Sequence, residues 1–166
     1  MKVGRIAITY SGLLLAAAVG LSFVHPWGDL RDVDARGELF GGSEVPHGVK
    51  EVLEQKCADC HSNRTHWPVY SRLAPGTWLM EHDVSGGRAA LNFSRWQEMR
   101  TEERVDALSR IAAEVRSEEM PPTAYTMMHP TRHISDTEKQ EVAAWARAER
   151  RRLRAAAEAA KEMSGQ

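Results

Sequence analysis

Two cysteines and a histidine stand together in the sequence Cys57-Ala58-Asp59-Cys60-His61. Cys57 and Cys60 are the only cysteines of the 166 residues. Side chains three positions apart on a helix lie on one face, so both thiols can add to the two vinyl groups on one side of a porphyrin. His61 then comes under the iron as the proximal nitrogen ligand. The C-x-x-C-H spacing is that of c-type haem attachment and predicts one covalently held haem c.

Two other interpretations of this cysteine pair stay open. A pair at this spacing also forms the disulfide of redox proteins, but that site expects a βαβ context, and no such pattern surrounds Cys57 and Cys60. A zinc ion would need a fourth ligand besides the two cysteines and His61, and no second cysteine pair exists to supply it. Because a covalent haem uses both thiols, we expect no disulfide.

A six-coordinate haem iron needs a second donor, for which Met120 is the first candidate. The residue before a proline is biased toward extended backbone, and Pro121-Pro122 stiffens the segment behind Met120. The thioether sulfur can then be held toward the iron at little entropic cost. Histidine and methionine together raise the potential of a cytochrome. His82, downstream of the haem motif, is the alternative distal ligand.

The N-terminus has the character of a membrane or export segment. Lys2 and Arg5 precede a stretch without charged residues from Ile6 to Val24, and acidic residues follow it. A bilayer-spanning helix needs ~20 apolar residues, and basic residues concentrate on its cytoplasmic side. We therefore expect a single-pass N-terminal transmembrane helix in the inner membrane, with the haem domain in the periplasm, where haem is attached covalently.

Cleavage of this segment is the alternative outcome. The small residues Ala16-Ala17-Ala18 would suit a signal peptidase, which would release a soluble periplasmic protein. Against cleavage, the apolar run continues to Val24, and Trp27 stands where an aromatic side chain would anchor a spanning helix at the interface.

Charge and length limit the function classes. The chain has 22 Lys and Arg against 23 Asp and Glu, a net charge of −1, which argues against nucleic acid as a partner. The chain beyond the first 26 residues suits one small domain. Redox partner proteins, and the membrane through the N-terminal helix, are the expected partners.

Helical patterns dominate, and the sequence predicts four regions. Residues 1–26 are the membrane anchor or signal segment, 27–45 a polar linker, 46–147 the haem-binding domain, and 148–166 a charged helical tail. Expected helices in the domain run from near Pro46 into the haem motif, from Pro75 to Gly86-Gly87, from an N-cap at Thr101 to Met120, and from a capping box formed by Ser135 and Glu138.

Aromatic residues gather between the two proposed iron ligands, and we expect them to wall the haem. They are Trp67, Tyr70, Trp78, Phe93 and Trp96. A drier surrounding of the iron disfavours the extra charge of the ferric state and raises the potential.

Several motifs in order resemble the haem-binding domain family of small bacterial c-type haem proteins, over roughly residues 46 to 147. They are the run from Cys57 to Ser71, Trp78 with Glu81-His82, Gly86-Gly87-Arg88, Leu91 to Trp96, Met120-Pro121-Pro122, Tyr125, His129-Pro130, and Ile134-Ser135-Asp136 before a last helix with Trp145. The resemblance implies one covalent haem c in an all-α, cytochrome c-like domain. It does not imply a characterised reaction.

Two function classes follow from a haem site of this kind. The first is a membrane-anchored monohaem c-type cytochrome that transfers single electrons on the periplasmic side. The second is a haem-based enzyme or gas sensor, peroxidase-like, with an open or labile distal position. No distal acid and base constellation stands out in the sequence, so the electron carrier is favoured over the enzyme.

Overall fold

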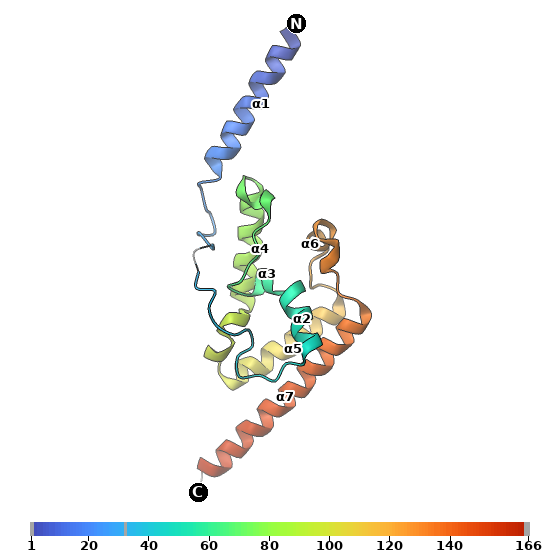
Figure 1. Cartoon of the computed structure of the whole chain (residues 1–166). Coiled ribbons are helices and arrows are strands. Elements are labelled where there is room, and N and C mark those ends of the chain that lie inside the picture. The colour runs from blue at the N-terminus through green and yellow to red at the C-terminus, as the bar shows by residue number, and fades with distance from the viewer. Residues whose placement is uncertain (1, 32, 165–166) are drawn as a thin grey trace.

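The computed structural model describes residues 2–31 and 33–164, and these form helices with no strand among them (Figure 1). The all-α prediction is confirmed. The α-helices are α1 (Lys2–Leu21), α2 (His47–Lys56), α3 (Ala58–His61), α4 (Gly76–Ala90), α5 (Thr101–Ser117), α6 (Thr123–Met128) and α7 (Asp136–Ser164). Short 3₁₀ turns lie at η1 (Val69–Arg72), η2 (Phe93–Glu98) and η3 (Pro130–Arg132).

The core of the domain lies where α5 packs along α7 (Figure 1). The residues of α5 predicted to face inward are all buried: Val105, Leu108, Ile111, Ala112 and Val115. Val142 and Trp145 of α7 face them from the other helix. Burying one large aliphatic side chain contributes ~1.5–3 kcal/mol. Helix α2 packs against α7 of this pair, and α3 packs against α4.

The stretch 27–45, expected as a linker, contributes to the core instead. Leu39 and Phe40 are buried, and the amide of Phe40 donates to the carbonyl of Phe93 at 3.2 Å. The Phe40 ring lies 4.4 Å from the ring of Phe93, 5.0 Å from Trp96 and 5.4 Å from Trp145, centroid to centroid. Two apolar residues within a polar, glycine-rich stretch carry no periodic signal, which is why the pattern suggested a spacer.

The expected N-terminal transmembrane helix is not supported. Among the residues that the structure describes, no helix combines the length and the apolar character needed to cross a membrane. Helix α1 ends at Leu21, so the apolar stretch that begins at Ile6 leaves the helix before it reaches Val24.

The chain that follows α1 is fastened to α4. The indole Nε1 of Trp78 donates to the carbonyl oxygen of Val24 at 2.8 Å. His25 Nδ1 lies 2.6 Å from Oε1 of Glu81, a carboxylate with no exposed surface. The second oxygen of Glu81, Oε2, is buried without a hydrogen-bond partner in the described part of the chain. Residues 24 and 25, just before the predicted boundary at residue 26, thus contact α4 directly.

Helix α4 does not stop at Gly86-Gly87 as the sequence suggested but continues to Ala90. Gly87 is needed for close packing rather than for termination. A Cβ atom at this position would lie 2.5 Å from the carbonyl oxygen of Cys60 and 2.9 Å from its Cβ. Without a side chain at Gly87, α4 approaches the backbone of α3, which carries the haem motif.

Of the two helix starts predicted from capping residues, one is confirmed and one is wrong. The capping box is confirmed, because the amide of Ser135 donates to Glu138 at 2.7 Å and the amide of Glu138 donates to the hydroxyl of Ser135 at 3.3 Å. Thr101 is the first residue of α5 and not its N-cap. Arg100 takes that place, and its amide donates to the carboxylate of Glu103 at 2.8 Å.

Lys56, the residue before Cys57, ties the end of α2 to the start of α7. Its Nζ lies 2.7 Å from each carboxylate oxygen of Glu138 and 2.7 Å from the carbonyl oxygen of His133. Burial alone would raise the pKa of Glu138, but the hydrogen bonds from Lys56 and Ser135 outweigh it and lower the pKa from 4.5 to about 2. The carboxylate thus stabilises the fold in its charged form.

We predict that Glu138→Gln lowers the free energy of unfolding by roughly 1–2 kcal/mol near pH 7, after allowance for solvent screening. The folded-state pKa of Glu138 lies below its unfolded value, so its contribution is fully present above pH 4.5 and is lost as the pH falls toward 2. Denaturant unfolding between pH 7 and pH 2 measures this. Glu141→Gln, at an exposed position of the same helix, is the control. A difference between Glu138→Gln and wild type that stays constant over the whole range would contradict the prediction.

Candidate functional site

The haem motif sits on its own short helix between α2 and α4. Helix α2 ends at Lys56, Cys57 forms the junction, and Ala58–His61 make the single turn α3. The amides of Cys60 and His61 both donate to the carbonyl of Cys57, at 3.2 and 3.0 Å. Both cysteines are free thiols and half-buried. The local geometry therefore places two thiols and an imidazole one helical turn apart, as the spacing predicts.

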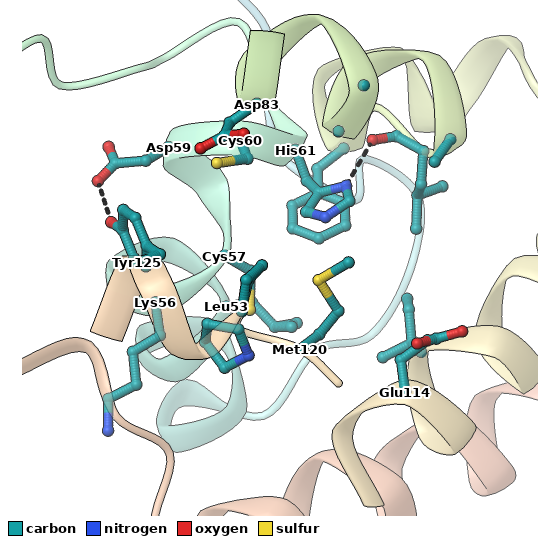
Figure 2. A pocket seen from close by; sticks show the side chains of 18 of the residues that line it. Leu53, Lys56, Cys57, Asp59, Cys60, His61, Asp83, Glu114, Met120 and Tyr125 are labelled. Atoms are coloured by element: carbon teal, nitrogen blue, oxygen red, sulfur yellow. Dashed lines mark hydrogen bonds between the residues drawn. The ribbon is translucent and has the colours of Figure 1, made fainter. Parts of the chain in front are cut away.

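A cavity of about 430 Å³ opens beside this turn (Figure 2). Its size falls in the range of pockets that hold cofactors, ~300–1,000 Å³. Its walls come from α2, α3, α4 and α5 and from the chain between Met120 and Tyr125. Most of the lining is apolar, with Leu53, Leu91, Phe93 and Ile111 among its residues. Such a cavity suits a flat, largely apolar group that is attached at one edge.

His61 is held in a fixed orientation. Its Nδ1 donates to the carbonyl oxygen of Leu91 at 3.1 Å, and its ring stacks on Phe93 with centroids 5.6 Å apart and an interplanar angle of 24°. Burial lowers the pKa of His61, although the backbone hydrogen bond with Leu91 opposes this shift. Because Nδ1 donates to Leu91, Nε2 is the ring nitrogen left to act as a ligand. This is the usual support of a metal-binding histidine.

Met120 lies on the other side of the same cavity. Figure 2 shows its thioether and the ring of His61 pointing toward one another, with Cys57 and Cys60 to one side of them. The Met120 side chain is partly exposed, and its amide donates to the carbonyl of Glu114 at 3.3 Å. The arrangement brings all four predicted residues to one cavity and suits a group bound between a nitrogen and a sulfur donor.

His82, the alternative distal ligand, also lines the cavity but is turned toward solvent. Its side chain is 64% exposed, and its Nδ1 lies 3.2 Å from a carboxylate oxygen of the adjacent Asp83. Its ring meets Trp27 edge-on at 5.4 Å. Met120, in contrast, faces His61 in Figure 2.

Burial makes both cysteine thiols weaker acids. It raises the pKa of Cys57 to about 12, and the neighbouring Cys60 thiol adds to the shift. It also raises the pKa of Cys60 to about 12, with the charge of Asp83 as the next cause. Because the thiolate is the nucleophile, both groups are weakly reactive in the folded chain before any bond is formed.

The predicted aromatic wall is only partly present. Phe93 lines the cavity, but Trp96 lies in the core beside Phe40, and the cavity lining includes neither Trp67 nor Trp78. Sequence patterns could not separate cavity from core, because both select large apolar residues. Tyr70 bonds to His129, with its hydroxyl 2.9 Å from Nε2, and does not line the cavity either.

Several contributors to the site carried no sequence signal. The carbonyl of Leu91 that orients His61 is a backbone group, and Tyr125 meets Asp59 only through the fold. Among the described residues, no group of three or more His, Cys, Asp or Glu side chains is arranged to hold a metal ion.

One curated relative is the cytochrome c peroxidase Ccp of Escherichia coli strain K12, which is 28% identical over 143 residues. The match covers 84% of this chain and 29% of the relative, so the chain spans less than a third of that protein's length. No solved structure matches this chain.

The model of the haem-binding domain family matches residues 16–148, which include the cavity, the haem motif and Met120. The match thus extends well beyond the five residues of the motif and covers most of the chain. The chain therefore belongs to the haem-binding domain family.

Proposed function

We propose that this chain is a monohaem c-type cytochrome that carries single electrons between redox partner proteins on the periplasmic side of the inner membrane. The observation that supports it most is the opposition of His61 and Met120 across one apolar cavity (Figure 2). Two strong-field donors on opposite faces of a haem iron leave no position for a substrate and suit outer-sphere electron transfer.

Each part of the chain has a distinct task in this proposal. Cys57 and Cys60 would fix the haem edge through thioether bonds, and one-electron chemistry between ferrous and ferric iron would come from the haem. His61 would offer its Nε2 to the iron, because its Nδ1 donates to the carbonyl of Leu91. The apolar walls exclude water, which limits reorganisation around the iron and favours the ferrous state.

A peroxidase-like enzyme or gas sensor is the second candidate. The peroxidase named above supports it, although this chain matches 29% of that protein. The exposed fraction of Met120, 37%, also favours it, because a ligand near the surface can leave the iron. Dissociation of Met120 would open the distal position to peroxide or to a diatomic gas.

The first prediction concerns attachment. Haem should stay with the denatured protein after acid-acetone extraction and should stain on a denaturing gel, because thioether bonds survive both treatments. Cys57→Ala with Cys60→Ala should abolish the stain. The single variants are the matched controls, since each retains one thiol. Haem that extracts freely from the unmodified protein would overturn the covalent assignment.

The second prediction concerns the sixth ligand. Met120→Ala should remove the weak ferric band at the red end of the spectrum that a thioether–iron bond produces, lower the potential, and let carbon monoxide bind the ferrous iron. His82→Ala, on the same cavity, should change none of these.

The reverse result, with His82→Ala opening the iron, would mean bis-histidine ligation and a lower potential. A wild-type iron that is already high-spin would favour the enzyme or sensor over the carrier.

The third prediction concerns compartment. Covalent haem attachment takes place outside the bacterial inner membrane, so the haem-stained protein should fractionate with the periplasm or envelope. A chain that begins at Val19 lacks the charged and apolar leader but keeps His25 and Trp78 in contact with their partners. It should stay in the cytoplasm without covalent haem. Equal haem staining of this shortened chain in the cytoplasm would contradict the proposed export.

A further inference from the structure

Asp59, between the two cysteines, joins the haem motif to the chain beyond Met120. One carboxylate oxygen, Oδ1, accepts from the amide of His66 at 2.9 Å, which fixes the side chain against its own loop. The other, Oδ2, accepts from the hydroxyl of Tyr125 at 2.9 Å, and a guanidinium nitrogen of Arg132 lies 3.6 Å away. Figure 2 shows this bond at the edge of the cavity where Cys60 lies.

Tyr125 ties α6 to the haem motif. It is the only buried residue of α6, all of whose residues the structure describes. Its neighbours Met127 and Met128 are exposed. The Tyr125 ring packs on His129 at 4.7 Å, and its hydroxyl is bonded to Asp59 of the haem motif. A helix of six residues has little stability of its own, so its position depends on this contact.

The position of Met120 depends on the same segment. Helix α5 ends at Ser117, and Glu118 turns the chain with a left-handed φ of 63°. Between this turn and α6, Met120 is held by the hydrogen bond from its amide to Glu114. The chain on its C-terminal side is tied to α3 through Tyr125. The hydrogen bond between Tyr125 and Asp59 thus links the sixth-ligand segment to the helix that carries the haem thiols.

We propose that Tyr125 and Asp59 are positioning residues that keep Met120 on the haem iron. The inference rests on the proposed ligation by Met120. A hydrogen bond to a charged oxygen is stronger than one between neutral groups, so the bond resists the thermal opening of a short surface segment. Burial, followed by the charge of Asp59, raises the pKa of Tyr125, so the hydroxyl keeps the proton that it donates. Loss of this bond leaves the covalent haem and His61 in place and loosens only the distal side.

The test compares Tyr125→Phe with wild type in the full-length holoprotein. The variant removes one hydroxyl and keeps the ring on His129. We expect carbon monoxide to bind the ferrous iron about tenfold faster, and the ferric thioether band to weaken, while the amount of covalent haem per chain is unchanged. Asp59→Asn keeps a neutral acceptor and should give an intermediate effect. This order of effects would not follow from a general loss of stability.

Tyr70→Phe is the matched control. Its hydroxyl bonds to the same His129, at 2.9 Å from Nε2, but not to Asp59, so the rate of carbon monoxide binding should equal that of wild type. Equal rates in Tyr125→Phe and wild type, with the thioether band intact in both, would overturn the positioning role and leave Met120 as the ligand. A wild-type spectrum without a thioether band would instead refute the proposed ligation itself. If Tyr125→Phe fails to fold, the Asp59→Asn variant tests the proposal instead. Carbon monoxide binding at the wild-type rate in Asp59→Asn would then overturn it.

Discussion

The hydrogen bond from His61 Nδ1 to the carbonyl of Leu91 is the interaction on which the site depends. Leu91 follows the last residue of α4, so the bond joins the haem motif to the end of the helix that packs directly against it. Gly87, one turn earlier on α4, lets the two backbones come close enough for this bond to form. The ring of Phe93 then fixes the plane of the imidazole. A backbone carbonyl, a missing side chain and an aromatic ring therefore determine where Nε2 points before any iron is bound.

The two sides of the cavity are built differently. The His61 side lies between regular helices and is tied to the core through Phe93, which packs on Phe40. The Met120 side is a turn and a short helix on the surface, joined to the rest by few contacts. Such a segment is the part of a domain that opens most easily. This asymmetry bears on the two candidate functions. An electron carrier would need Met120 to stay bound to the iron, whereas a peroxidase-like enzyme would need it to dissociate.

Short-range patterns predicted much of this structure. The helical turn of Ala58–His61, the buried face of α5 and the capping box of Ser135 and Glu138 depend on residues within a few positions of one another, and all three are present. The errors concern contacts between distant residues. Phe40 reaches the core from a stretch expected as a linker. Gly87 lets α4 approach the backbone of Cys60, a contact that no local pattern reveals. The bond between Asp59 and Tyr125 joins residues 66 positions apart. The expected N-terminal span is unsupported for a related reason, because an apolar run alone does not fix where a helix ends.

Ligation of the iron by both His61 and Met120 is best tested with the electron paramagnetic resonance and optical spectra of the purified, unmodified ferric holoprotein. Together these spectra report the spin state and both axial ligands. We expect a single low-spin iron with histidine and thioether ligands. A high-spin signal, or a low-spin signal of two histidines, would contradict the opposition of His61 and Met120 across the iron.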